Sequence, residues 1–186
     1  MNRPWVTKRA LAGIMSALVL SSLLTSCGGD KSIVEPEPPA SLSELFGPVL
    51  YKADGDSVGI EAVDGKAIIA IYFSARWCPA CAGFTPQLLS AYQELQQNGR
   101  SFEVVLVSLD DSSQEMFAHM MDYDMPWVAV PYGGEKADSL VRRYAVAWIP
   151  TLIVIDGQGQ TISLNGREDV GSKGAGAYED WLAKGA

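Results

Sequence analysis

Two of the three cysteines, Cys78 and Cys81, stand three residues apart in the sequence Cys-Pro-Ala-Cys. This spacing suits half of a zinc site, a structural disulfide, or a dithiol that cycles between reduced and oxidised forms. A structural zinc site needs four ligands, and the chain offers one such pair and a single, distant histidine, His119. A disulfide that closes so short a loop constrains the unfolded chain very little. We therefore favour the redox pair, with the other two interpretations left open.

The residues on either side place the pair between a strand and a helix. The run 67–73 is continuously apolar and partly β-branched, which predicts a strand buried on both faces. From 80 to 98 apolar side chains recur at helical spacing, which predicts a helix that begins directly after the motif. The pair is thus expected where a buried strand turns into a helix.

That position favours different roles for the two thiols. Cys78 is expected to lie exposed in the first turn, where unpaired backbone N–H groups and the helix dipole stabilise a thiolate. Pro79 suits the first helical position because its missing N–H would be unpaired there. Cys81, one turn further, is expected to be more buried and to remain a thiol until Cys78 has reacted.

The rest of the pattern predicts one α/β domain over residues 42–186, with a mixed central sheet flanked by helices. Besides the first strand and helix, the hydrophobic pattern and the turn signals predict strands at 102–109, 151–156 and 160–165, and helices that follow Ser112 and cover 135–144 and 178–184. The last two strands are expected to form an antiparallel hairpin.

Residues 1–26 have the pattern of an export signal. Three basic residues precede the apolar run 10–24, and no acidic residue occurs before Asp30. The alternative, a membrane-spanning anchor helix, is disfavoured because a span needs about 20 apolar residues. Residues 28–41 are rich in Gly and Pro, which predicts a solvated tether.

The end of this segment, Leu-Thr-Ser-Cys at 24–27, resembles the bacterial lipobox. The resemblance implies cleavage before Cys27 and lipidation of that cysteine, while an ordinary cleavage with a stray cysteine is the alternative. Because Gly28 rather than Asp follows, it further implies a lipid-anchored protein of the bacterial cell envelope, facing the periplasm from the outer membrane. The expected organisation is a signal peptide at 1–26, a lipidated cysteine and tether at 27–41, and a domain at 42–186.

Three motifs carry a family resemblance. They are YFSARWCPACAGFTP at 72–86, MPWVAVP at 125–131 and WIPTL at 148–152. In their order and spacing they resemble the thioredoxin-fold superfamily, and within it the tryparedoxin and nucleoredoxin group. The resemblance implies a thioredoxin-like fold with a cis-proline loop.

The resemblance also implies roles for single residues. Cys78 corresponds to the attacking cysteine and Cys81 to the resolving one. Pro150, after Ile149, corresponds to the cis-proline that packs against the redox pair and presents backbone to the substrate. Trp77 corresponds to the tryptophan that flanks the active site, with an ordinary core aromatic as the alternative.

Two departures concern the charges around the pair. Ordinary thioredoxins carry a buried Asp six residues before the first cysteine, and here that position is Tyr72, as in tryparedoxins, so that it is not a carboxylate base. The residue after Cys81 is basic in the resembling proteins and is Ala82 here. Arg76 is a candidate to replace that charge beside Cys78, although a solvated surface arginine is the alternative.

These observations predict a thiol–disulfide oxidoreductase that reduces disulfides of exported proteins, is supplied by a membrane dithiol donor, and needs no metal or organic cofactor. The rival interpretation is a non-catalytic binding module of the cell envelope. The formal net charge of −8, without a basic run, argues against nucleic acid as a partner. Cleavage at Cys27 would remove three basic residues and no acidic one, which makes the net charge −11.

Overall fold

The computed structural model describes residues 41–185, so the predicted signal segment, Cys27 and nearly all of the tether lie outside the described residues. In chain order the elements are α1 (Leu42–Phe46), β1 (Val49–Tyr51), β2 (Ser57–Gly59), the 3-10 helix η1 (Ile60–Ala62), β3 (Ile68–Ser74), α2 (Pro79–Gln97), β4 (Phe102–Ser108), α3 (Ser113–Asp122), β5 (Val128–Ala129), α4 (Glu135–Arg143), β6 (Thr151–Asp156), β7 (Thr161–Ser163), α5 (Gly166–Lys173), the 3-10 helix η2 (Gly174–Gly176) and α6 (Ala177–Lys184). None of these helices is long and apolar enough to cross a membrane.

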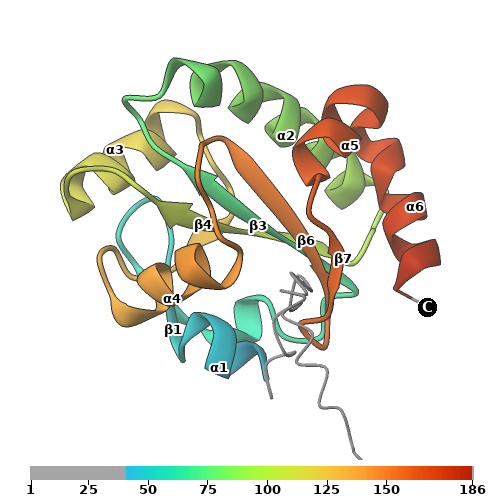
Figure 1. The fold of residues 1–186 in the computed structure, drawn as a ribbon, viewed down its shortest axis with the longest axis horizontal. Helices are drawn as coiled ribbons and strands as arrows, with labels where there is room; N and C mark the ends of the chain where they lie inside the picture. Colours follow the sequence, from blue (N-terminus) through green and yellow to red (C-terminus); the bar gives the residue numbers. More distant parts are fainter. Residues whose placement is uncertain (1–40, 186) are drawn as a thin grey trace, which may run out of the picture. The chain divides into compact units, whose positions relative to one another are not determined.

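The strands form one mixed sheet in the order β2-β1-β5-β4-β3-β6-β7 (Figure 1). The central strand β3 pairs in parallel with β4 and antiparallel with β6. β5 adds a short parallel pairing to β4, and β7 pairs antiparallel with β6 as the hairpin pattern predicted. The predicted mixed α/β sheet flanked by helices is therefore confirmed.

Helices cover both faces of the sheet, as the uninterrupted apolar run in β3 requires. One set of alternate β3 residues, which includes Tyr72, packs in a cluster with α2, α3, α5 and α6. The other set, which includes Phe73, packs in a second cluster with α1 and α4. All seven residues of β3 and all seven of β4 are buried, so the packed central strands fix the positions at which the loops leave the sheet.

The chain segments that hold the predicted motif meet at one edge of the sheet. Because β3 and β4 are parallel, their carboxyl ends at Ser74 and Ser108 lie side by side. β6 runs in the opposite direction, so the loop that enters it at Thr151 arrives at the same edge. The turn into α2 leaves from this edge too, which brings the residues around 76–78, 109–110 and 148–150 together.

Candidate active site

Cys78 is the N-cap residue of α2, one position before the first turn in which it was expected. Its backbone is extended (φ −90°, ψ 111°), and its sulfur accepts the N–H of Cys81 at 3.2 Å. The expectation that Cys78 is exposed is wrong: only 5% of the residue is accessible. Ala75, Leu109 and Ile149 pack around the two cysteines, and the Cys78 thiol points to the carbonyl of Ile149 at 3.7 Å. Pro79 occupies the first helical position, as predicted.

Cys81 is completely buried, in agreement with its predicted position. Burial raises the pKa of its thiol to about 11, and the hydrogen bond with Cys78 and the charge of Cys78 act in the same direction. Two neighbours oppose this rise, because the backbone N–H of Ala75 and the hydroxyl of Ser74 stabilise the Cys81 thiolate. The pair therefore consists of one sulfur at a helix end and one thiol that remains protonated at neutral pH.

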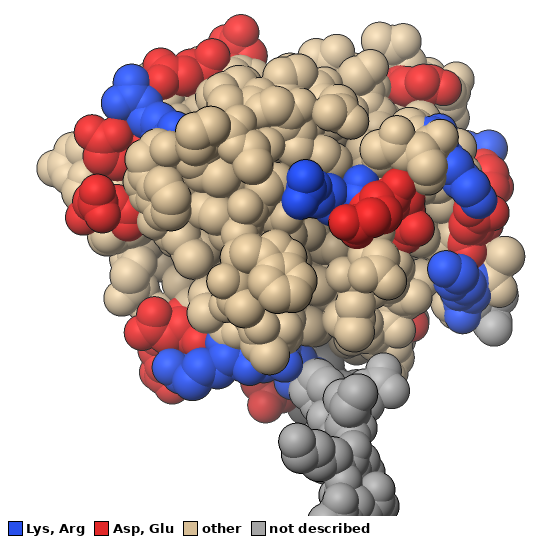
Figure 2. Space-filling model, turned by 45° about the horizontal axis from the view of Figure 1, so that its top comes forward, with Lys and Arg blue, Asp and Glu red and all other residues tan. Residues whose placement is uncertain are grey.

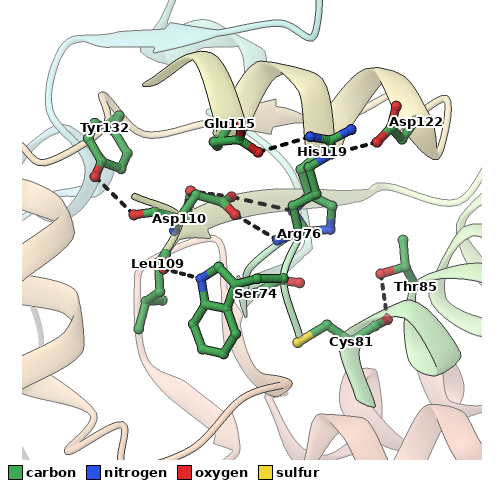
Figure 3. Close-up of polar contacts among 12 residues, drawn as sticks. Ser74, Arg76, Cys81, Thr85, Leu109, Asp110, Glu115, His119, Asp122 and Tyr132 are labelled. Atoms are coloured by element: carbon green, nitrogen blue, oxygen red, sulfur yellow. Dashed lines mark hydrogen bonds and ion pairs between the residues drawn. The ribbon is translucent and has the colours of Figure 1, made fainter. Parts of the chain in front are cut away.

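A chain of hydroxyl groups runs beside Cys81. Thr85 donates to the carbonyl of Cys81 at 2.8 Å (Figure 3). The Tyr72 hydroxyl lies 2.8 Å from that of Thr85, and Ser74 donates to Tyr72 at 3.1 Å. Since the Thr85 proton is already engaged, Tyr72 is the donor to Thr85. Burial raises the pKa of Tyr72 to about 12, so it stays neutral. Sequence reasoning singled out Tyr72 but missed Ser74 and Thr85. Ser74 could have been noticed as a serine at the end of a buried strand, and Thr85 as a threonine four residues after Cys81, the spacing at which its hydroxyl reaches the Cys81 carbonyl.

The turn before Cys78 is fastened to the end of β4. Asp110 accepts the backbone N–H of Arg76 at 2.7 Å, and the indole N–H of Trp77 donates to the carbonyl of Leu109 at 3.2 Å (Figure 3). Asp110 is itself held, because Ser108 donates to its second carboxylate oxygen at 2.7 Å. These contacts fix the backbone that leads into the attacking cysteine.

Asp110 faces His119 of α3 in the interior, behind this turn. The two residues are 7% and 1% exposed, and Nδ1 of His119 lies 3.6 Å from the carboxylate (Figure 3). Burial acts to raise the pKa of Asp110, but the contact with His119 and the hydrogen bonds from Ser108 and the Arg76 N–H together hold it below its usual value. Sequence reasoning missed Asp110 and considered His119 only as a histidine too distant to complete a zinc site. The histidine lies in a buried position on α3.

Arg76 does not supply a charge to Cys78. Its guanidinium forms ion pairs with Asp122 at 2.7 Å and with Glu115 at 3.0 Å, both on α3 (Figure 3). Both carboxylates raise the pKa of Arg76, because they hydrogen-bond its cationic form. The side chain is about two-fifths exposed and joins the turn to α3, which favours the surface arginine among the two alternatives that the sequence offered.

The loop that ends at Pro150 completes the site. The Ile149–Pro150 bond is cis, as the resemblance implied. Trp77 is 60% exposed beside Cys78, so its flanking position is confirmed, whereas Trp127 is a core residue packed between the rings of Tyr72 and Tyr92. An open groove of about 390 Å³ lies between the Cys78 turn and residues 146–149.

No three His, Cys, Asp or Glu side chains within residues 41–185 gather in a way that could hold a metal ion. The groups at this edge of the sheet that can react are the two thiols. The Cys78 sulfur caps helix α2 beside an apolar groove, and the Cys81 thiol is buried next to it. A cysteine pair at the start of a helix, next to a cis-proline loop on a mixed sheet, defines a thioredoxin-like protein.

Comparison with known proteins gives the same class. The family model described as thioredoxin-like matches residues 65–161, and the chain belongs to the thioredoxin-like family of oxidoreductases. Nucleoredoxin of Bos taurus is 37% identical over 139 residues, which cover 73% of this chain and 31% of the relative. Probable nucleoredoxin 1 of Arabidopsis thaliana is 38% identical over 125 residues, covering 67% of this chain and 21% of the relative. The chain thus spans about a third or less of the length of these curated relatives.

Solved structures match over nearly their whole length. Thioredoxin from Wuchereria bancrofti is 40% identical, with a TM-score of 0.64, and the match covers 75% of this chain and 96% of that one. Tryparedoxin I from Leishmania major is 30% identical, also with a TM-score of 0.64, covering 73% and 92%. The family match over residues 65–161 includes strands β3 to β6 and the loops that form the site.

Proposed function

We propose that this chain is a thiol–disulfide oxidoreductase that reduces disulfides of other proteins through Cys78 and Cys81. The observation that carries the proposal is the asymmetry of the pair: the Cys78 sulfur caps α2 at the mouth of a groove, and Cys81 is fully buried behind it. A helix end stabilises negative charge on the first sulfur, while burial keeps the second protonated until it is needed.

The reaction has two exchange steps. The Cys78 thiolate attacks one sulfur of the substrate disulfide, forms a mixed disulfide, and expels the other substrate sulfur as a thiolate that takes a proton from water. Cys81 then loses its proton and attacks the Cys78 sulfur, which releases the second substrate thiol. Two electrons pass to the substrate, and the protein is left with a Cys78–Cys81 disulfide that a dithiol donor must reduce.

The mixed disulfide itself prepares Cys81 for the second step. Two causes of its high pKa are the hydrogen bond with Cys78 and the charge of Cys78, and both end when Cys78 becomes bonded to substrate. The opposing contacts from Ala75 N–H and Ser74 remain. The pKa of Cys81 therefore falls when the mixed disulfide forms, so the resolving thiol becomes reactive only after there is something to resolve.

The proposed direction is reduction. Strong oxidants of this chemistry depend on an unusually stabilised thiolate. Within the described residues, the polar contacts of the Cys78 sulfur are a backbone N–H, a backbone carbonyl and the Cys81 thiol, and Arg76 is engaged with α3. The lipobox-like sequence at Cys27 supports placement on the periplasmic face of a bacterial membrane, with exported disulfide-containing proteins as substrates and a membrane dithiol as donor.

The deciding experiment traps the intermediate. Cys81→Ser is expected to hold substrate proteins on Cys78 as mixed disulfides that dithiothreitol releases, and Cys78→Ser to hold none and to reduce no insulin. If wild-type protein neither reduces insulin nor cycles between dithiol and disulfide in glutathione buffers, a non-catalytic binding module becomes the better account.

A further inference from the structure

Two tryptophan side chains are exposed around the Cys78 sulfur. Trp77 is 60% exposed and Trp148 is 73% exposed, the highest value among the large exposed apolar side chains of the described residues. One comes from the turn before α2 and the other from the loop before Pro150, which are the two segments that enclose the sulfur. Aromatic side chains carry a large apolar surface, so two left in water beside a nucleophile point to a binding surface.

The Trp77 side chain and the Trp148 backbone are each held by a hydrogen bond. The Trp77 indole N–H is already bonded to the carbonyl of Leu109, so what Trp77 offers a ligand is its apolar face. The backbone at Trp148 is fixed by the Thr151 hydroxyl, which donates to the Trp148 carbonyl at 2.8 Å. Contacts with pre-positioned side chains cost less ordering entropy than contacts with side chains that must first be immobilised.

The side chains that line the groove between them are apolar and surround the reactive Cys78 sulfur. All nine residues that line it have apolar side chains, and they come from the Cys78 turn, the end of β4 and the 146–149 loop. Trp148 also lines a second depression of about 270 Å³, whose wall includes Leu164, Arg167 and Glu168. Trp148 thus lines two neighbouring hollows, the apolar groove that contains the Cys78 sulfur and the depression whose wall includes Arg167 and Glu168. The face of the molecule drawn in Figure 2 has wide uncharged areas, with charged side chains along its rim and one group of basic and acidic side chains to the right of its centre.

The occupant of the groove must carry a disulfide, because the groove contains the Cys78 sulfur. A small charged disulfide such as oxidised glutathione would find no ion-pair partner among the lining residues and would meet a protein of formal net charge −8. A polypeptide cystine next to an apolar or aromatic residue would instead bury that side chain between the two indoles. Such cystines are exposed in unfolded chains, because folded proteins bury most large apolar side chains.

We propose that Trp148 is a specificity-determining residue, and that Trp77 and Trp148 together clamp an apolar or aromatic side chain adjacent to the substrate cystine. The inference rests on the proposed disulfide exchange and adds the class of substrate to it. Trp148→Ser removes the indole and leaves a small polar side chain on the same backbone, so it is the test variant.

The test measures the second-order rate constant with which the dithiothreitol-reduced full chain, freed of excess reductant, reduces three disulfides. Two are disulfide-linked dimers of uncharged peptides, Gly-Cys-Phe-Gly and Gly-Cys-Ser-Gly, and the third is oxidised glutathione. The wild type is expected to favour the Phe peptide over the Ser peptide by at least about fivefold, the effect of one aromatic contact. Trp148→Ser should lose that preference with little change toward the Ser peptide and glutathione, and Trp148→Phe should retain most of it.

The control is Met121→Ser, which removes a 57% exposed apolar side chain of α3 that does not line the groove and should leave the preference unchanged. Equal losses for all three disulfides in Trp148→Ser would show a structural role and overturn the inference, as would a wild type without preference. In both cases the disulfide exchange itself would stand. A wild type that reduces none of the three would instead remove the proposed function.

Discussion

Ser74→Ala should slow the resolving step of the reaction while it leaves the first attack unchanged. Ser74 is completely buried, and its hydroxyl is one of two groups that stabilise the Cys81 thiolate. The position of Tyr72 carries no carboxylate. The Ser74 hydroxyl donates its one proton to Tyr72 in the structure, and turning that proton to Cys81 stabilises the thiolate, which helps Cys81 to lose its own proton. Alanine fills nearly the same space and removes the hydrogen bond.

The expected size follows from the cost of a charge-assisted hydrogen bond, about 1.5–3 kcal/mol. At about 1.36 kcal/mol per unit, its loss raises the pKa of Cys81 by roughly 1–2 units and lowers the thiolate fraction at neutral pH by roughly 10- to 100-fold. A more basic thiolate is a better nucleophile, with a Brønsted slope of about 0.4–0.5, which recovers roughly 3- to 10-fold. The net loss in the rate of resolution is therefore roughly 3- to 10-fold.

Stopped-flow reaction with Ellman's reagent separates the two steps. Attack by Cys78 releases one thionitrobenzoate, and attack by Cys81 on the resulting mixed disulfide releases the second. Only the second phase should slow in Ser74→Ala, and its rate should keep rising to a higher pH than in the wild type. Ser163→Ala is the matched control, because Ser163 is also a buried serine but bonds to Asp169, away from the cysteines. A second phase within twofold of the wild-type rate, or equal slowing of both phases, would refute the reasoning.

Three further predictions concern stability, anchoring and direction. Asp110→Asn should lower the free energy of unfolding at pH 7 by about 1.5–3 kcal/mol in urea titrations. Because the pKa of Asp110 is lower in the folded state, its stabilising contribution is present above the unfolded pKa of about 3.9 and is lost as the pH falls through the folded pKa. A difference from the wild type that persists undiminished at pH 2 would contradict this prediction. Cys27→Ala should abolish labelling by a radioactive fatty acid without changing the insulin reductase activity of the domain, and equal labelling of the variant would show that Cys27 is not the lipid site. Equilibration with glutathione should give a reduction potential below about −200 mV, whereas one near the strong-oxidant value of about −120 mV would reverse the proposed direction.

Local patterns in the sequence predicted the elements that carry the cysteines. The buried run before the motif became β3, and the helical spacing after it became α2 with Pro79 at its start. Ser112 caps α3 by accepting the Glu115 N–H at 3.1 Å, as the capping pattern indicated. Helices α1 and α5 were not predicted. α1 has only five residues, and α5 has two glycines and little apolar periodicity, so neither carries a strong local signal.

Errors at the site arose where contacts between distant segments decide the outcome. Cys78 was expected to be exposed, but Leu109 and Ile149 arrive from other parts of the chain and cover it. The sequence left open whether Arg76 acts on Cys78 or lies on the surface, because the carboxylates of α3 that engage it are 39 and 46 residues away. Asp110 follows a strand like many loop aspartates, and only the parallel pairing of β3 with β4 places it under the active-site turn.

The cap that Cys78 provides for α2 links electron transfer to folding. A thiolate accepts the Cys81 N–H more strongly than a sulfur engaged in a disulfide does, since hydrogen bonds to charged groups are the stronger kind. The backbone N–H of Cys81 at the start of α2 therefore has a stronger hydrogen bond in the reduced chain than in the oxidised chain. Because reduction and unfolding form a closed thermodynamic cycle, any substitution that makes α2 depend more on this cap favours the reduced form by the same free energy. The tendency of the chain to give up electrons is in this sense a property of its helix as well as of its sulfurs.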